Sequence, residues 1–354
     1  MALQSFRVHD FRCLSGVELE AHPVFNLITG KNAAGKTSLL EAIYYLGRGK
    51  SFRNGTAAEL IRSGADNLTL FGTVETQEGP AKIGVDVSRG TKLIRKDGEN
   101  AKTADLATSL PVQAIDPEIH ELIQGGPEKR RRFIDWGVFH VEQGYIESWR
   151  IYKTTLKQRN AALRAGAAPA SVAAWDEMLV KSGNSIDLLR KDYIGRFITR
   201  LSSILSEISP YELKISYYSG WKDGVSLSEA LNSNRERDRV LQATQAGPHR
   251  ADLKLRIDGS GAKHRLSRGQ QKLLGAALVI AQTHFVAEAL GRNVVLLVDD
   301  PAAELDTEHQ EHLYNLLRNV PAQLFVTSLN PEDSLLNKAG KSFSIDAGTV
   351  LALV

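Results

Sequence analysis

The sequence predicts an α/β protein in which the two ends of the chain form one mixed unit and the middle forms a second, mainly helical lobe. Three observations support this prediction. An apolar strand near the start runs into a glycine-rich loop and a helix, and a second apolar strand ending in two aspartates lies near the end. The segment between them has helical periodicity and few strand signals. The expected parts are residues 1–115, 116–242 and 243–354.

The first third of the chain alternates between strand and helix signals. Strands are expected over residues 3–11 and 17–20, and a buried strand over 24–29 ends at a glycine. Apolar residues at helical spacing follow over 37–46, and alternation between turn signals predicts antiparallel strands over 68–94. Together these segments predict a strand, loop and helix beside an antiparallel sheet.

The middle and the end of the chain differ in character. Residues 117–240 read mainly as helices, and the Ala/Gly/Pro-rich break at 165–169 predicts two antiparallel helices joined by a loop. Strands return over 251–257 and 293–298, with a long helix from Gly269 between them.

Composition excludes several classes of protein. Lys and Arg number 44 against 41 Asp and Glu, with 42% hydrophobic residues, so neither a disordered tail nor a polycation fits. Cys13 is the single cysteine, which excludes an intramolecular disulfide and a cysteine-based zinc site and suits the cytoplasm. No signal peptide is indicated at the start. The apolar stretch 273–290 is interrupted by Gln282, His284 and Glu288, so no membrane span is expected.

A phosphate-binding loop follows the first buried strand. Two glycines let backbone N–H groups turn inward around phosphates, the lysine contacts the β- and γ-phosphates, and the threonine hydroxyl ligates Mg²⁺. The pattern occupies Gly30, Lys31, Asn32, Ala33, Ala34, Gly35, Lys36 and Thr37. The alternative is a chance glycine turn, but the flanking strand and helix favour nucleotide binding. The loop alone does not distinguish ATP from GTP.

The second apolar strand ends at Asp299 and Asp300. A phosphate loop needs a carboxylate at the end of a neighbouring strand, so Asp299 is the expected metal ligand. Asp300 is then placed to orient the attacking water or accept its proton. Because Pro301 follows, these carboxylates have an alternative role as the cap of a helix.

Between these elements, Ser267 to Gln270 precede a long helix. The segment resembles the signature motif of ABC-type ATPases, in which Ser and Gly at a helix N-terminus bind the γ-phosphate of a nucleotide held by another subunit. Taken alone, Ser267 is also a suitable helix N-cap. Glu304 and Asp306 lie in a segment similar to the D-loop of the same class, which contacts the opposite subunit.

The whole chain resembles the RecF family of bacterial recombination mediator ATPases. The similarity includes Asp10-Phe11-Arg12, the phosphate loop with the helix after it, Gly49-Lys50-Ser51-Phe52-Arg53, and the segments around Arg130, Asp135, Gly247 to Leu253, Ser267 and Asp299. It implies a P-loop ABC-type ATPase head with an inserted, mainly helical second lobe. It also implies ATP and Mg²⁺ as cofactors and a homodimer that forms on ATP.

The resemblance further implies double-stranded and gapped DNA, RecR with RecO, and indirectly RecA as partners. The expected activity is a weak, DNA-stimulated ATPase that acts in repair, replication restart and SOS induction, where slow hydrolysis resets the dimer. The resemblance assigns catalytic roles to Lys36, Asp299, Asp300, Ser267, Gly269 and Gln270. It adds Ser38 and Arg12 to the nucleotide-binding residues and assigns contacts across the dimer to Ser267, Arg268, Gly269, Glu304 and Asp306.

The chain departs from related patterns at three places. The family usually has Gly then Ser where this sequence has Ala33 and Ala34, which predicts a stiffer loop because alanine adopts positive φ less readily than glycine. Pro301 replaces a less constrained residue. Ser328 stands where the transporter class has a histidine, so the γ-phosphate sensor there is undefined.

A basic segment in the helical lobe is the candidate DNA surface. Nine Lys and Arg lie between residues 129 and 164, against three acidic residues. Phosphate contacts from such residues give salt-dependent, sequence-independent affinity. The candidate DNA contacts are Lys129, Arg130, Arg131, Arg132, Lys153 and Lys157. The alternatives are an ordinary solvated face, or Arg130 and Arg131 as structural partners of Asp135 or Glu128.

Two other functions compete with an ATP-gated DNA clamp. An ABC-like ATPase of a nuclease or phage-exclusion system needs a further acidic metal cluster. A scaffold that binds ATP only structurally does not need Asp299 and Asp300, and a turnover assay separates it from an ATPase.

Overall fold

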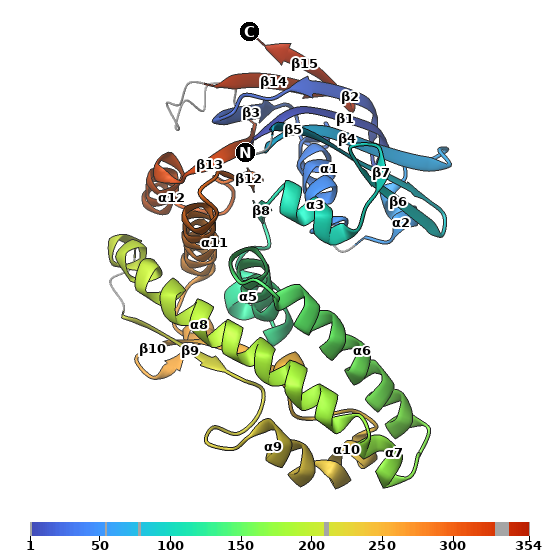
Figure 1. Ribbon diagram of the computed structural model, residues 1–354. Helices are drawn as coiled ribbons and strands as arrows, with labels where there is room; N and C mark the ends of the chain where they lie inside the picture. Colours follow the sequence, from blue (N-terminus) through green and yellow to red (C-terminus); the bar gives the residue numbers. More distant parts are fainter. Residues whose placement is uncertain (1, 54, 77–78, 209–211, 330–339, 354) are drawn as a thin grey trace. The chain divides into compact units, whose positions relative to one another are not determined.

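The computed structural model describes residues 2–53, 55–76, 79–208, 212–329 and 340–353 (Figure 1). Contacts divide the chain into two units, a first unit of Met1–Ile119 with Lys272–Val354 and a second unit of His120–Gln271. The second boundary therefore lies after Gln271, whereas the sequence predicted it after residue 242. The strand at 252–257 accounts for this difference, because it pairs with a strand of the second unit.

The first unit contains a largely parallel sheet of order β15-β14-β3-β13-β12-β8. Its strands are β3 (Phe25–Thr29), β8 (Val112–Ile115), β12 (Val294–Val298), β13 (Ala322–Ser328), β14 (Lys341–Asp346) and β15 (Thr349–Leu353). Every residue of β3, β12 and β13 is buried. Burial on both faces explains the wholly apolar sequence of β12, because a central parallel strand is covered on both sides. The buried amides of β3 and β13 are hydrogen-bonded, Asn26 to the carbonyl of Leu324 and Gln323 to the carbonyl of Leu3. The order also places the N-terminal β3 directly beside two C-terminal strands.

A second sheet in this unit is wholly antiparallel, with the order β2-β1-β4-β5-β6-β7. Its strands are β1 (Leu3–Phe11), β2 (Leu14–Glu20), β4 (Asn67–Thr76), β5 (Gly79–Ser88), β6 (Thr91–Lys96) and β7 (Glu99–Asn100). Buried and exposed residues alternate along β1 and β5, as expected for a sheet with one covered face.

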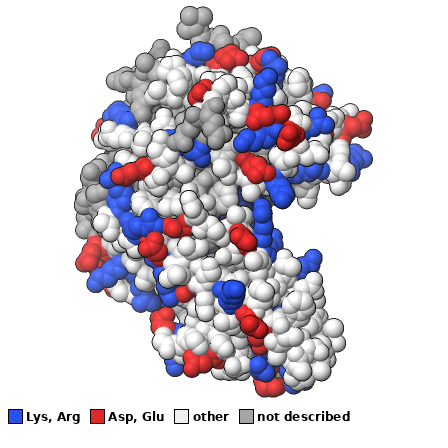
Figure 2. All heavy atoms as spheres, in the orientation of Figure 1, with Lys and Arg blue, Asp and Glu red and all other residues white. Residues whose placement is uncertain are grey.

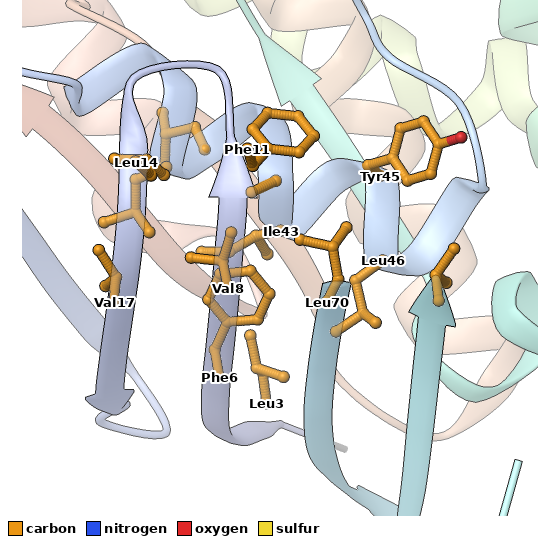
Figure 3. Close-up of a cluster of buried hydrophobic side chains, with 14 of the residues drawn as sticks. Leu3, Phe6, Val8, Phe11, Leu14, Val17, Ile43, Tyr45, Leu46 and Leu70 are labelled. Carbon is orange, nitrogen blue, oxygen red and sulfur yellow. The ribbon is translucent and has the colours of Figure 1, made fainter. Parts of the chain in front are cut away.

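Helix α1 (Lys36–Arg48) contacts strands of both sheets. Figure 3 shows its side chains Ile43 and Leu46 against Leu3, Val8 and Leu70 of the antiparallel sheet. All five side chains are fully buried, and burial of each contributes about 1.5–3 kcal/mol to folding. This packing fixes the helix that follows the phosphate loop.

The remaining helices of the first unit are α2 (Ala57–Leu60), α3 (Thr103–Ser109) and α12 (Thr307–Asn319). Helix α11 (Arg268–Leu290) begins in the second unit and continues into the first. By length and composition α11 could cross a membrane, but 72% of its apolar window is buried within the protein. This burial identifies α11 as a core helix of the protein.

The second unit is mainly helical, with a three-stranded antiparallel sheet of order β11-β10-β9. Its helices are α4 (Glu121–Gln124), α5 (Pro127–Val141), α6 (Tyr145–Arg164), α7 (Pro169–Ala173), α8 (Asp176–Ile208), α9 (Leu227–Ser233) and α10 (Arg235–Leu241), with short 3₁₀ turns at Pro248–Arg250 and Ala262–His264. The strands are β9 (Leu213–Tyr218), β10 (Asp252–Ile257) and β11 (Ser260–Gly261). Helices α6 and α8 lie side by side and antiparallel (Figure 1), which confirms the expected helix pair.

Two buried arginines organise the second unit. Arg159 is 1% exposed and pairs with Asp176 at 2.8 Å and with the fully buried Asp238 at 2.7 Å. Arg190 is also fully buried, pairs with Asp135 at 2.7 Å and donates to the carbonyl of Pro248 at 2.8 Å. Part of the positive charge counted in the sequence between 129 and 164 is thus internal.

Replacement of Arg159 by methionine is expected to lower the free energy of unfolding by about 3–5 kcal/mol, because Asp238 would remain buried without its cation. Chemical denaturation monitored by circular dichroism measures this change. Arg164→Met, at an exposed position of the same helix, is the control and should change stability by less than ~0.5 kcal/mol. Equal losses in the two variants would contradict the role of the buried pair.

Candidate nucleotide-binding site

The predicted phosphate loop lies between β3 and α1, where the sequence placed it. Gly30 has φ +153°, and a Cβ there would come within 2.3 Å of the carbonyl oxygen of Ile345 on β14. Gly35 has φ +115° and caps α1 at its N-terminus. The positive φ at both positions favours glycine, and at Gly30 the close approach of β14 also excludes a Cβ.

Ala33 adopts the left-handed conformation, with φ +62°. This conformation costs a non-glycine residue about 1–2 kcal/mol. Its neighbour Ala34 is buried and accepts a hydrogen bond from the N–H of Gly348 at 2.9 Å. The loop thus keeps its turn despite the two alanines, because contacts with the C-terminal hairpin hold it.

Lys36 lies at the first turn of α1, and its Nζ donates to the carbonyls of Gly30 at 2.6 Å and Lys31 at 3.0 Å. Burial lowers the pKa of Lys36, while the charges of Asp300 and Asp299 oppose this effect. The ammonium group is therefore held over the loop backbone and near two carboxylates. A nucleotide bound in the loop would bring its phosphate oxygens to this ammonium group.

Thr37 and Asp299 meet directly, although they are far apart in the sequence. The Thr37 hydroxyl donates to the Asp299 carboxylate, with distances of 2.8 and 3.1 Å to its two oxygens. The hydroxyl of Thr327 on β13 donates to Asp299 at 2.8 Å and accepts from the N–H of Asp300 at 2.8 Å. A hydroxyl and a carboxylate are oxygen ligands of the kind that Mg²⁺ takes together with phosphates. The residues present therefore fit the predicted Mg²⁺.

Thr327 was not predicted as a site residue. It could have been found from its place near the end of the buried strand β13, which lies beside β12, the strand that ends at Asp299. Ser328, the residue discussed as a sensor, is buried at the end of the same strand.

A buried carboxylate, Glu41, lies one turn beyond Thr37 on α1. It is fully buried and receives two hydrogen bonds from the Arg12 guanidinium, at 2.8 and 3.1 Å. The hydroxyl of Ser51 also donates to it, and Arg53 lies 3.7 Å away. Glu41 belongs to a helix whose sequence matches the family, but no local pattern predicts a role for it; in the structure it anchors Arg12.

Arg12 lines a cavity of about 610 Å³ together with Ser38 of α1. Cys13, Arg62 and Arg89 are also in its wall. The cavity therefore joins two residues predicted to bind ATP, Arg12 and Ser38.

The signature segment lies at the N-terminus of α11. The Oγ of Ser267 accepts from the N–H of Gln270 at 3.2 Å, and the Gln270 side chain accepts from the N–H of Ser267 at 3.0 Å. This reciprocal pair is a capping box. Ser267 and Arg268 are exposed, and Gly269 and Gln270 are half-buried.

The D-loop-like segment also ends in a helix cap. Asp306 accepts from the N–H of His309 at 2.8 Å, and this bond is the main cause that lowers the pKa of Asp306. Glu304 is exposed and has φ +63°. The backbone before it is held by Lys272, which donates to the carbonyl of Ala303.

The predicted DNA contacts fall into two groups. Arg130 pairs with Asp252 at 2.7 Å, and Arg131 donates to the carbonyl of Ala251 at 2.8 Å, so these two arginines connect α5 with β10. The structure therefore favours the structural alternative for them, with partners other than those the sequence suggested. Lys129 lies 3.7 Å from Glu121, and Arg132 forms an exposed pair with Glu128.

Lys153 and Lys157 differ from this group. They lie on the exposed face of α6 with Arg150 and Arg164. At 3.6 residues per turn the four side chains fall within an arc of about 60° and span roughly 21 Å. None of the four lies within ion-pair distance of a carboxylate in the described part of the chain. On the face drawn in Figure 2, cations and anions are interspersed, so a local stripe of one sign is a distinct feature.

The segment before β10 matches a motif of the family, but its chemistry predicts no role for it. His249 hydrogen-bonds to the Tyr152 hydroxyl at 2.6 Å and to the carbonyl of Thr244 at 3.0 Å. Burial lowers the pKa of His249 to about 4, so the ring is neutral at neutral pH. These hydrogen bonds all lie within the second unit.

Comparison with known proteins places this geometry in a family. The chain matches the family described as RecF/RecN/SMC N terminal domain over residues 2–347. The DNA replication and repair protein RecF of Shewanella amazonensis is 40% identical, with 99% of each chain covered. That of Pseudomonas putida is 43% identical over 94% of this chain and 92% of the relative. The chain belongs to the RecF family.

Solved structures agree with this assignment. A RecF structure described as the recombination mediator protein RecF-ATP in the RecFOR pathway superposes with a TM-score of 0.90 at 29% identity, covering 100% of this chain and 98% of that one. An SMC head bound to the C-winged helix domain of ScpA has a TM-score of 0.59 at 15% identity, covering 100% and 98%. The second likeness shows the fold alone. The chain thus has the mixed α/β, ABC-like head fold of RecF and SMC proteins, as predicted.

Glu41→Gln is expected to lower the free energy of unfolding by about 1.5–3 kcal/mol, because Arg12 and Ser51 lose their charged acceptor. Chemical denaturation gives the value. The control is Glu18→Gln, which breaks an exposed pair with Arg7 and should cost less than ~1 kcal/mol. A loss no larger than the control's would show that Glu41 does not anchor Arg12.

Proposed function

We propose that this chain is an ATP-dependent recombination mediator that binds duplex DNA as an ATP-closed homodimer. The single observation that best supports this function is the direct pairing of Thr37 with Asp299 beside Lys36, in a chain similar to RecF proteins over its whole length. Lys36 would hold the β- and γ-phosphates, and Thr37 and Asp299 would hold Mg²⁺. The metal would neutralise charge on the transferred phosphoryl group.

Hydrolysis in this proposal depends on residues that orient water. Asp300 adjoins the metal carboxylate, and its backbone N–H is held by Thr327. It is the candidate general base, as expected from its place after the apolar strand. Because Asp299 and Asp300 are both intact, we propose a weak, DNA-stimulated ATPase rather than a structural ATP site.

Dimerisation in this proposal uses the signature in trans. Ser267, Arg268 and Gly269 at the start of α11 would bind the γ-phosphate held by the other subunit, with Glu304 and Asp306 beside it. The helix N-terminus has a dipole and free N–H groups that favour a phosphate. Because ADP lacks the γ-phosphate, hydrolysis would reopen the dimer.

Ser267→Arg is expected to block ATP-driven dimerisation while leaving ATP binding intact, because the larger cation obstructs the trans contact. Sedimentation with ADP, ATP, and ATP plus short duplex DNA measures the oligomeric state, and a fluorescent nucleotide measures binding. Ser226→Arg is a matched control, since Ser226 forms an equivalent capping box at α9. A wild-type protein that stays monomeric with ATP and DNA would contradict the clamp.

Duplex DNA would bind along the basic stripe of α6, formed by Arg150, Lys153, Lys157 and Arg164. Contacts to phosphates need no base recognition, so binding would depend strongly on salt. Gaps and junctions of single- and double-stranded DNA are the proposed substrates in the cell. The segment Lys129–Arg132 contributes less in this proposal, because Arg130 and Arg131 are occupied within the second unit.

Lys153→Gln with Lys157→Gln is expected to reduce the salt slope of duplex binding, log K against log salt, by about 2, roughly one for each lost phosphate contact. Fluorescence anisotropy with a 20-base-pair duplex at several salt concentrations gives the slope. Lys222→Gln with Arg237→Gln removes two exposed cations elsewhere in the second unit and should leave the slope unchanged. A slope unaltered in the first variant would place the DNA surface elsewhere.

The proposed partners follow from the family. We infer that the protein acts in the cytoplasm with RecO and RecR, promotes loading of RecA, and so serves DNA repair, replication restart and SOS induction. An ABC-like ATPase of a nuclease or phage-exclusion system remains the second candidate. It would need an added acidic metal cluster, and in the described ranges no three His, Cys, Asp or Glu side chains gather as one would require.

A further inference from the structure

Thr327 joins the two acidic residues that follow β12 through a single hydroxyl. It is fully buried on β13, the parallel strand beside β12. Its hydroxyl lies 2.8 Å from the Asp299 carboxylate and 2.8 Å from the backbone nitrogen of Asp300. One side chain therefore contacts the candidate metal ligand and the candidate general base at the same time.

The chemistry of the partners fixes the direction of both hydrogen bonds. A backbone N–H only donates, so the Thr327 oxygen must accept from Asp300. The hydroxyl proton is then directed to the Asp299 carboxylate, which only accepts when it is ionised. A bond from a hydroxyl to a carboxylate is charge-assisted and stronger than a neutral one. The hydroxyl is thus held in one orientation by its two partners.

The bond from Thr327 makes the two oxygens of Asp299 unequal. Oδ1 accepts from Thr327 at 2.8 Å and from Thr37 at 3.1 Å. Oδ2 accepts from Thr37 at 2.8 Å, and it has no other donor among the described residues. A carboxylate oxygen has two lone pairs, so Oδ2 keeps one that could ligate Mg²⁺. Thr327 therefore determines which oxygen of Asp299 faces the candidate metal site.

The bond to Asp300 falls where the backbone leaves β12. The N–H of Asp299 still donates to the carbonyl of Ile115 on β8 at 2.9 Å. Because N–H groups alternate in direction along a strand, that of Asp300 faces β13, where the Thr327 hydroxyl accepts it. Asp300 itself has φ +46°. This left-handed conformation is unfavourable for a residue other than glycine, so surrounding contacts must hold it.

Two further features keep Asp300 in this conformation. Its carbonyl accepts from the N–H of Ala303 at 3.1 Å, which closes a turn. Pro301 follows it, and a proline disfavours the right-handed α conformation in the residue before it. Because its N–H, its carbonyl and its φ are all constrained, the direction in which the Asp300 side chain leaves the backbone is also constrained.

We propose that Thr327 is a positioning residue for ATP hydrolysis, which aligns the metal carboxylate and the general base together. The inference rests on the proposed function, because it gives Thr327 a part in the ATPase reaction. Loss of the hydroxyl would release Oδ1 of Asp299 and would leave the buried N–H of Asp300 without its acceptor. Both carboxylates would then lose their alignment. Lys36 and the phosphate loop would be unchanged, so ATP would still bind.

The test compares Thr327→Val, which removes the hydroxyl, with Thr327→Ser, which keeps it, in the full chain. The valine variant should lower kcat for ATP at saturating Mg²⁺ at least tenfold, with less than a threefold change in KM. The Mg²⁺ concentration needed for half of the Mg²⁺-dependent binding of a fluorescent ATP analogue should rise at least threefold. In EDTA the analogue should bind the valine variant and the wild type equally. The serine variant should recover at least half of the wild-type kcat.

A matched control is Thr283→Val, in the same unit. Thr283 is fully buried on α11, and its hydroxyl has no hydrogen-bond partner in the part of the chain that the structure describes. This variant loses a buried hydroxyl of the same kind, so it should keep the wild-type kcat and the wild-type Mg²⁺ requirement. Chemical denaturation without nucleotide checks that each variant is folded.

The outcomes separate this role from the proposed function. A valine variant with the wild-type kcat and Mg²⁺ requirement would overturn the role of Thr327 and leave the proposed ATPase standing. A serine variant as impaired as the valine variant would also overturn it, because the loss would come from packing and not from the hydroxyl. A wild-type protein that shows no Mg²⁺-dependent ATP binding would overturn both proposals.

Discussion

The hydrogen bond between Thr37 and Asp299 is the contact on which the first unit depends for its site. It joins the helix after the phosphate loop to a strand from the far end of the chain. This contact is possible because β3 lies between two C-terminal strands, β13 and β14. The loop is built in the same way, since Gly30 packs under Ile345 and Ala34 bonds to Gly348. Neither end of the chain can form the site alone.

The second unit can be inserted between these ends because it has its own means of stability. Arg159 and Arg190 are buried with their carboxylates, and aromatic side chains pack beside them. Buried ion pairs add little net stability, but they penalise any packing that leaves a charge unpaired. Arg159 and Arg190 add to the positive charge counted in the sequence, but they are buried in ion pairs and add no charge to the surface. The exposed stripe on α6 is one group of cations that stays available to an external partner.

Sequence patterns predicted the positions of the candidate-site residues where local chemistry determines the structure. The glycines at 30 and 35, Lys36 and Asp299 lie as expected, because a strand, tight turn and helix leave few alternatives. The sequence predicted less where a side chain's partner is set by contacts between distant segments. No local signal shows that Arg130 meets Asp252, or that Glu41 anchors Arg12. The boundary after 242 differed for the same reason, since strand pairing between β9 and β10 is not local.

The two roles considered for Ser267 are compatible on chemical grounds. In the capping box its oxygen accepts from the N–H of Gln270. A serine hydroxyl has two acceptor sites and one donor, so capping leaves the O–H free to donate. A γ-phosphate accepts such a bond and also suits the positive end of the α11 dipole. The cap therefore orients the hydroxyl beforehand, and the proposed trans contact would form without any cost from breaking the helix start.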